Sequence, residues 1–183
     1  MSISRLIKSI KDDPKLAHSF DNTPNAPNEL INNLESARSG AKIGLKELID
    51  IATVKSLRRI ELIKINECNT VRAITQLAFN SEKIQDETVR IGILCALHGV
   101  RVPMASAILS WVYPDRWAVI DRRSWSALAH FNLVNGSVSS RLSPNNWATY
   151  CKIMKELSQA TGQTPQWLDR WLYSFARKNN LGA

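Results

Sequence analysis

The amino-acid sequence predicts an all-α protein of about eight to ten helices, because apolar residues recur three to four positions apart over most of the chain. Pro103 stands where it would fall in the first turn of a predicted helix, the position that proline tolerates best, and Pro144 and Pro165 lie near the starts of two further predicted helices. Only residues 117–121, WAVID, resemble a buried strand, and this segment is short and lies between two helix signals. The 183 residues are expected to form a single helical domain.

The N-terminal part of the domain, residues 1–27, is predicted to hold a short helix and a loop. The segment SRLIKSIK has the helical pattern, whereas DNTPNAPN at 21–28 contains two prolines and three asparagines and therefore predicts an exposed loop. A second helix is expected over residues 28–38, with Ser39-Gly40 as its C-terminal cap.

Residues 28–131 are predicted to form a helical core that includes a hairpin at 97–104. Apolar residues recur at helical spacing from 42 to about 65, and Thr70 is the predicted cap of the helix that follows. Asp86 is predicted to begin a helix that continues to residue 97. The apolar stripe of this helix consists of Val89, Ile93 and Leu97.

The C-terminal part of the domain, residues 132–183, is predicted to add the helices that complete a second lobe. The expected architecture is therefore a compact, two-lobed helical bundle. The further helical segments are 103–112, 123–131, 146–160 and 165–178.

The charge of the chain is positive and unevenly distributed. Residues 1–50 contain seven basic and seven acidic side chains, whereas residues 51–183 contain seventeen basic and nine acidic ones and carry the whole net charge of +8. A basic excess confined to one part of a chain favours a polyanionic partner such as nucleic acid.

The N-terminal residues, the length of the apolar runs and the number of cysteines predict an intracellular protein without a disulfide framework. The first residues lack a hydrophobic signal core and include acids, and no apolar run is long enough for a membrane span, so we expect a cytoplasmic protein with no membrane partner. Cys68, Cys95 and Cys151 are odd in number and far apart, which indicates free thiols. No metal site is expected, because the three histidines share no ligand spacing.

The turn between the predicted helices 86–97 and 103–112 is the first candidate site. Gly99 can adopt a positive φ and can therefore turn the chain sharply. The second helix begins directly after the turn, and its first amide groups lack partners inside the helix, which is typical of an anion-binding site. A DNA phosphate would satisfy such donors without any reading of the base sequence.

This turn resembles the helix-hairpin-helix motif, whose usual form is Leu-x-Gly-Val-Gly followed by two variable residues, a small or hydroxyl residue and Ala. Leu97, Gly99, Val100 and Ala105 match, and Arg101 replaces the second glycine. The similarity extends over about residues 86–131 to the helix-hairpin-helix DNA glycosylases, the superfamily that includes endonuclease III and the adenine glycosylases. The resemblance implies double-stranded DNA as partner. The residues it assigns to DNA binding are Gly99, Val100, Arg101, Met104, Arg122 and Arg123.

The resemblance also implies a catalytic carboxylate, since these enzymes carry an Asp after a Pro-containing loop and an apolar step. Asp121, 22 residues after Gly99, stands at this place. A carboxylate there would stabilise the positive charge that develops on deoxyribose as the base departs. The alternative role of Asp121 is a helix cap that accepts hydrogen bonds from the amides of Arg123 or Ser124.

Other features refine the expected activity. Trp117 and Trp125 are candidates for a base pocket or for the core beneath it. Relatives that also nick DNA use a lysine near the start of the second hairpin helix, where this chain has Pro103, so base removal without an efficient lyase step is expected. An iron–sulfur cluster is not expected, because Cys151 is the only cysteine near the C-terminus, and neither is any other cofactor.

The sequence therefore favours a monofunctional DNA glycosylase that removes a damaged or modified base, in repair or against foreign DNA. Two alternatives stay open: a non-catalytic helix-hairpin-helix DNA-binding protein, and a helical module for protein interaction. Sensitivity of DNA binding to salt separates the last from the other two.

Overall fold

The computed structural model describes residues 2–19, 28–136 and 141–182, and in these ranges all regular secondary structure is helical. The prediction of an all-α protein is confirmed. Of the loop predicted at 21–28, residues 21–27 lie outside the described residues, and Asn28 is the first residue of α2. The helices are α1 (Ser2–Asp12), η1 (Pro14–His18), α2 (Asn28–Gly40), α3 (Leu45–Lys55), η2 (Leu57–Arg59), α4 (Ile60–Lys64), α5 (Cys68–Phe79), α6 (Glu87–Leu94), α7 (Val102–Val112), α8 (Arg122–His130), α9 (Pro144–Thr161) and α10 (Pro165–Lys178).

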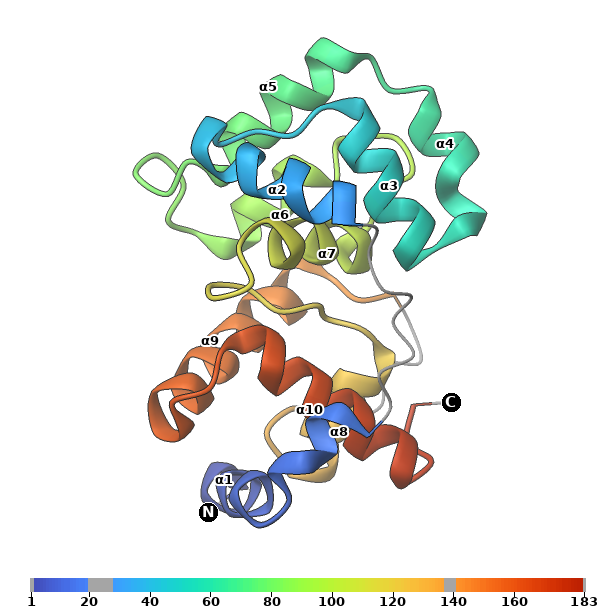
Figure 1. The fold of residues 1–183 in the computed structure, drawn as a ribbon. Coiled ribbons are helices and arrows are strands. Elements are labelled where there is room, and N and C mark those ends of the chain that lie inside the picture. Colours follow the sequence, from blue (N-terminus) through green and yellow to red (C-terminus); the bar gives the residue numbers. More distant parts are fainter. Residues whose placement is uncertain (1, 20–27, 137–140, 183) are drawn as a thin grey trace.

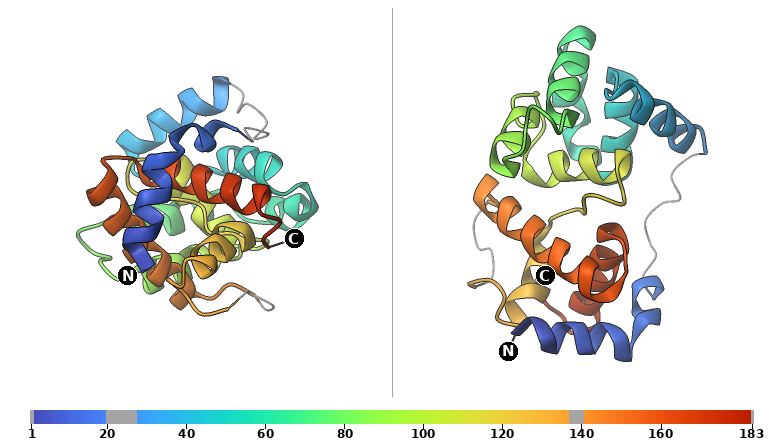
Figure 2. Two further views of the ribbon diagram at one scale, coloured as in Figure 1. Left: turned by 90° about the horizontal axis from the view of Figure 1, so that it is seen from below. Right: turned by 90° about the vertical axis from the view of Figure 1, so that its left-hand side faces the viewer.

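The helices gather into two groups, one formed by α2 to α7 and the other by α1 and α8 to α10 (Figures 1 and 2). The N-terminal segment thus lies with the C-terminal helices, and polar contacts join the two. The indole N–H of Trp171 donates to the carbonyl of Asp13 at 2.9 Å, and Lys178 lies 3.4 Å from the Asp13 carboxylate. None of the described helices has the length and apolar character needed to cross a membrane.

Several predicted helix boundaries differ from the structure. The helical pattern of residues 42–65 is interrupted at Ser56, whose φ of −167° and ψ of 87° are not helical, so α3 ends at Lys55. Thr70 does not cap α5, which begins at Cys68 after Glu67. The turn after α2 lies one residue later than predicted, because Ala41 rather than Gly40 takes a positive φ of 48°.

The buried face of α6 differs from the predicted stripe. Val89 is 48% exposed, and Arg90, Ile91 and Leu94 are the residues that face the interior. Asp86 caps this helix as predicted, since its carboxylate accepts hydrogen bonds from the amides at positions 88 and 89. A periodic pattern of apolar residues could not reveal this face, because a charged side chain lies at its centre.

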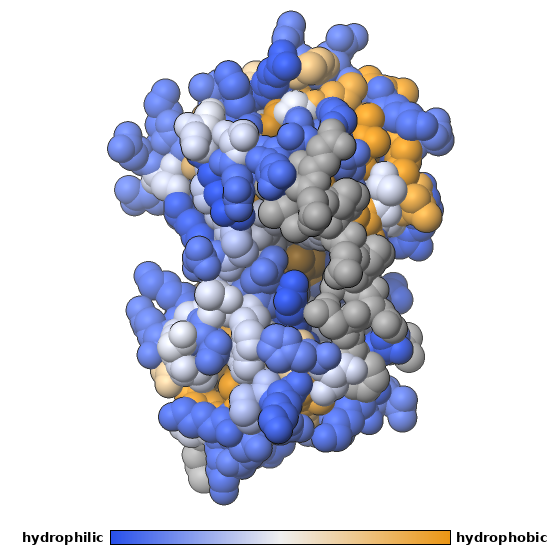
Figure 3. All heavy atoms as spheres, viewed as in Figure 1, coloured by the Kyte–Doolittle hydropathy of each residue, from blue (hydrophilic) through white to orange (hydrophobic). Residues whose placement is uncertain are grey.

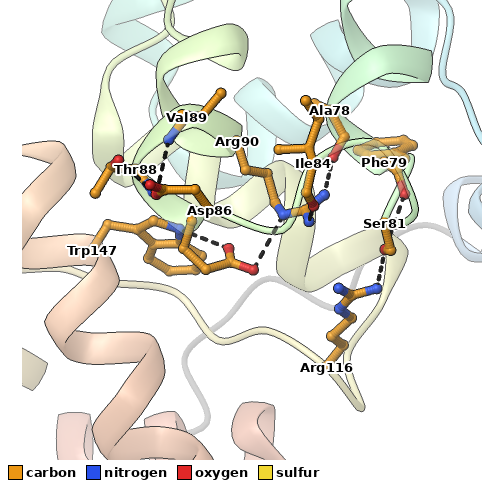
Figure 4. A network of polar contacts seen from close by, with 11 residues as sticks. Ala78, Phe79, Ser81, Ile84, Asp86, Thr88, Val89, Arg90, Arg116 and Trp147 are labelled. Atoms are coloured by element: carbon orange, nitrogen blue, oxygen red, sulfur yellow. Dashed lines mark hydrogen bonds and ion pairs between the residues drawn. The ribbon is translucent and has the colours of Figure 1, made fainter.

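Arg90 is completely buried and connects several elements. Its guanidinium donates to the carbonyl groups of Ala78 and Ile84 and lies 3.2 Å from the carboxylate of Glu87 (Figure 4). The second oxygen of Glu87 accepts a 3.3 Å hydrogen bond from the indole N–H of Trp147 in α9. A buried charge is tolerated when it is paired and hydrogen-bonded, so this network can join the two groups of helices through the interior.

The turn between α6 and α7 packs closely against α4. Gly99 has a φ of 77°, and a Cβ built there would lie 2.8 Å from Cγ1 of Ile63 and 3.1 Å from its backbone nitrogen. The buried amide of Asn66 holds the same turn, because it accepts from the His98 N–H at 2.8 Å and donates to the His98 carbonyl at 3.0 Å. Glycine is thus required at 99 by backbone angle and by space.

Arg101, which replaces the second glycine of the motif, needs no special backbone angle. Its φ of −124° and ψ of 170° are extended and open to any residue. The hairpin turn therefore accommodates an arginine at this place.

An apolar area interrupts the hydrophilic surface beside α4 (Figure 3). Leu57 is 67% exposed, Leu62 44% and Ile65 61%, and these residues belong to η2, α4 and the turn that follows. Exposed apolar side chains in such a cluster mark an interaction surface more often than an isolated one does.

Substitution of Gly99 by alanine is expected to destabilise the protein more than the same change at Gly162. Both glycines have a positive φ, but nothing lies within 4 Å of a Cβ built at Gly162. Gly162→Ala should cost about 1 to 2 kcal/mol for the left-handed backbone, and Gly99→Ala about 1 to 3 kcal/mol more for the overlap with Ile63. Urea denaturation of both variants measures the difference, and equal losses would contradict the close packing.

Candidate functional site

A cavity of about 710 Å³ lies between the two groups of helices, where the end of α3, the hairpin turn, the start of α8 and the chain after α10 meet. Its charged lining is almost entirely positive, since Asp121 is the one carboxylate among the described residues that line it. The cationic residues are Lys55, Arg58, Arg59, Arg101, Arg122, Arg123 and Arg141. Such a focused positive potential attracts polyanions.

Asp121 is the N-cap of α8, as the alternative reading of the sequence predicted. Its Oδ1 accepts hydrogen bonds from the amides of Arg123 and Ser124, each at 2.9 Å, and its own N–H donates to Ser124 Oγ at 3.0 Å. The side chain keeps 27% of its surface exposed and lines the cavity. One carboxylate oxygen thus anchors the residue, while Oδ2 is directed to the ammonium group of Lys55, 4.0 Å away.

The segment before Asp121 is held as firmly as the helix after it. The amide of Ile120 donates to Ser106 Oγ in α7 at 3.1 Å, and both residues are fully buried. The segment 117–121, which resembled a strand, has no regular secondary structure and forms no ladder among the described residues. Its apolar residues fill the core, and Asp121 emerges from it at a defined place.

The hairpin contributes to the cavity through three of the predicted residues. Gly99, Arg101 and Met104 line it, as do Arg122 and Arg123 of α8. The guanidinium of Arg123 lies over the ring of Tyr173, 5.5 Å from its centroid, a cation–π contact that orients the arginine along the cavity wall.

Val100, Trp117 and Trp125 lie elsewhere. Val100 is 2% exposed, Trp117 3% and Trp125 4%, and none of them lines the cavity. The two tryptophans therefore belong to the core, and the guanidinium groups of Arg90 and Arg116 lie over the ring of Trp117, 5.0 and 4.3 Å from its centroid. The aromatic side chain that does line the cavity is Tyr173 of α10.

The first turn of α7 offers fewer amide donors than predicted. Pro103 has no N–H, and the amide of Met104 already donates to the carbonyl of Arg101 at 2.8 Å. The attraction of this site for anions therefore comes mainly from its arginines.

Sequence reasoning missed part of the lining. Lys55 is the last residue of α3, Ser56 follows it and Arg59 is the last residue of η2, and all three line the cavity beside the hairpin. Arg58 and Arg59 look like ordinary surface charges in the sequence. The one signal was the Lys-Ser-Leu-Arg-Arg run itself, in which three cations follow an apolar helix.

A second carboxyl group lies behind Asp121. Asp169 of α10 accepts a 2.8 Å hydrogen bond from the hydroxyl of Tyr150 and another from the backbone of Val119. Burial raises the pKa of Asp169 to about 7, and the negative charge of Asp121 acts in the same direction. Burial also raises the pKa of Tyr150 well above its ordinary value, so this hydroxyl keeps its proton and remains a donor.

Among the described residues no three of His, Cys, Asp and Glu lie close enough to hold an ion together. Cys95 lines the cavity, and burial raises the pKa of its thiol, which therefore carries its proton at neutral pH.

Comparison of the chain with family models, curated proteins and solved structures found no match.

Replacement of Asp169 by Asn is expected to change how stability depends on pH. The Asp169 carboxyl binds its proton more tightly in the folded than in the unfolded chain, so its stabilising contribution is present at low pH and is lost as the pH rises through about 7. Asp169→Asn removes that loss. The difference in free energy of unfolding, Asp169→Asn minus wild type, should therefore become more positive by about 2 to 3 kcal/mol between about pH 5 and about pH 8.

The matched control is Asp115→Asn, which alters an exposed carboxylate outside the cavity. Chemical denaturation across this pH range should give the control the same profile as the wild type. A profile of Asp169→Asn parallel to that of the wild type would show that this carboxyl is not buried as described.

Proposed function

We propose that this protein binds double-stranded DNA and hydrolyses the N-glycosidic bond of a damaged or modified nucleotide. The observation that carries the proposal is the position of Asp121, whose carboxylate lines a cavity surrounded by cationic side chains and next to the hairpin turn. The grouping of the helices on either side of this cavity fits a two-lobed glycosylase-like bundle, as the sequence resemblance implies.

The charge of the cavity supports a nucleic acid partner. Arginines from the η2 segment, from the hairpin and from α8 converge on it, although they are far apart in the chain. Arginine is suited to phosphate because its planar fork of donors matches phosphate oxygens. Contacts of this kind position DNA without reading its sequence, which suits an enzyme that recognises a single altered nucleotide.

The geometry of Asp121 supports hydrolysis of a glycosidic bond. As the base leaves, positive charge develops on the deoxyribose ring, and a fixed carboxylate stabilises that charge. The hydrogen bonds to Oδ1 hold the group in place, while Oδ2 remains available to the sugar or to an attacking water molecule. Preorganisation of this kind avoids a rearrangement during the reaction.

The cavity can also receive a nucleotide that has left the base stack. Its volume of about 710 Å³ exceeds the size of a single base, and Tyr173 offers an aromatic face on its wall. Leu57 is 67% exposed and lies in the chain between Ser56 and Arg58, which both line the cavity. An exposed apolar side chain next to such a cavity can occupy the space that an extruded base vacates.

A second function is favoured by one observation: the hydrogen bonds of Asp121 satisfy the start of α8 completely enough to explain the residue without catalysis. On that reading the protein binds DNA and leaves it intact. A measurement of base release separates the two functions.

Asp121→Asn is expected to abolish base release while the fold is retained, because asparagine still provides an oxygen to cap α8. The assay incubates the protein with duplexes that carry a panel of damaged and modified bases, and hot alkali then cleaves at any abasic site. We expect a loss of at least about a hundredfold, the scale of a removed electrostatic stabiliser.

The matched control is Asp86→Asn, which changes the same residue type at the N-cap of α6, on an exposed surface outside the cavity. This variant should release base at the wild-type rate. Full activity of Asp121→Asn would refute the catalytic role, and salt-dependent DNA binding without base release on a broad panel would favour the non-catalytic function.

DNA affinity is expected to fall steeply with salt, and Arg101→Ala should reduce the slope of log affinity against log salt by about 1. Arg101 is exposed and lines the cavity, whereas Arg170 is exposed on α10 outside it. Arg170→Ala should therefore leave the slope unchanged. Fluorescence anisotropy with a labelled duplex measures all three proteins, and affinity independent of salt would instead support a protein partner.

A further inference from the structure

We propose that Lys55 is a second catalytic residue of this site, a nucleophile that forms an imine with the sugar of an abasic nucleotide and leads to cleavage of the DNA strand. The inference rests on the proposed function and deepens it by adding a strand-cleaving activity. The resemblance implied that no lysine is available for this step, because Pro103 stands where strand-cleaving relatives have one. In the fold, Lys55 of α3 brings an amine to the cavity instead.

The position of Lys55 follows from the interruption of the helix. Lys55 is the last residue of α3, and the extended backbone of Ser56 turns the chain away immediately afterwards. The side chain is 26% exposed, lines the cavity and places Nζ 4.0 Å from Oδ2 of Asp121. The amine and the carboxylate are 66 residues apart in the chain, and the same sugar carbon could be reached by both.

Lys55 is the sole amine among the described residues that line the cavity. The arginine side chains there are not nucleophiles, because guanidinium keeps its proton under all ordinary conditions. The thiol of Cys95 is the other nucleophile on the wall, and burial raises the pKa of that group and so disfavours the reactive thiolate. The chemistry of the cavity therefore favours attack by the lysine.

The reaction needs no oxidant, reductant or cofactor. The uncharged amine of Lys55 attacks the aldehyde carbon C1′ of the open abasic sugar, a C–N bond forms, and water leaves to give an imine. The carboxylate of Asp121 then takes a proton from C2′, the electron pair of that C–H bond forms a C=C bond as the C3′–O bond breaks, and the downstream strand departs with its 5′ phosphate. Water hydrolyses the imine, which releases the unsaturated aldehyde and restores the amine.

Asp121 is placed to assist both stages. Its carboxylate lies 4.0 Å from the amine and can accept a proton from the nitrogen as the C–N bond forms. Because the pair is held in a cavity lined by arginines, the phosphates on either side of the sugar can be bound at the same time.

The test uses a duplex with a preformed abasic site, so that it does not depend on which base the protein recognises. Sodium cyanoborohydride reduces an imine to a stable amine and thus joins the protein covalently to the DNA. Wild-type protein should give the joined product on a denaturing gel, and Lys55→Arg should reduce it by at least about tenfold. Arginine keeps the positive charge and removes the nucleophile.

Lys155→Arg is the matched control, since Lys155 is exposed on α9 and does not line the cavity. This variant should join to DNA as the wild type does. Peptide mass spectrometry of the wild-type product gives a readout that does not depend on any variant, and it should place the added mass on the peptide that contains Lys55.

Absence of a joined product with wild-type protein, an unchanged yield with Lys55→Arg, or attachment at another lysine would each overturn the proposal. Binding to the same abasic duplex is measured in parallel. If binding persists without a joined product, the role of Lys55 fails while the proposed function stands. If the abasic duplex is not bound at all, both fail.

Discussion

The fixed carboxylate of Asp121 is the constraint on which the site depends. Two amides of α8 and the hydroxyl of Ser124 hold one oxygen, and the hydrogen bond from Ile120 to Ser106 fixes the segment that leads to it. The same residue therefore begins a helix and presents an oxygen to the cavity. A role in capping and a role in catalysis do not compete here, because they use different oxygen atoms and the first provides the rigidity that the second requires.

The elements around Asp121 are held in place by contacts that do not involve Asp121 itself. Gly99 lets the hairpin turn lie against Ile63, and Asn66 secures the turn through both of its amide atoms. Arg90 joins the end of α5 to α6, and through Glu87 to α9. Together these contacts hold the hairpin turn against α4 and join α6 to α5 and α9, while the hydrogen bond from Ile120 to Ser106 fixes the segment that leads into α8. A small displacement of any of them would separate the arginines from the carboxylate that they surround.

Much of the fold and one half of the site could be predicted from the sequence. Helical periodicity, the prolines in first turns and the cap at Asp86 are local signals, and so are Gly99 and Asp121. Lys55 and Arg59 could not be assigned in this way, because their position depends on how α3 packs against the hairpin rather than on their neighbours in the chain. For the tryptophans, closeness in sequence gave a wrong expectation of their place in the site. Trp117 and Trp125 are close to Asp121 in sequence, but their large rings are stabilised in the core, and Tyr173 of α10 reaches the cavity instead.

The central claim is that the carboxylate of Asp121 stabilises a cationic sugar, and it can be tested without knowledge of the base. Two duplexes are compared, one with a cationic pyrrolidine in place of a deoxyribose and one with a neutral tetrahydrofuran. An enzyme binds a mimic of its transition state more tightly than a neutral analogue. The wild-type protein should therefore prefer the cationic duplex by at least about tenfold in Kd, and Asp121→Asn should lose this preference. Equal affinity of the wild-type protein for the two duplexes would contradict the account.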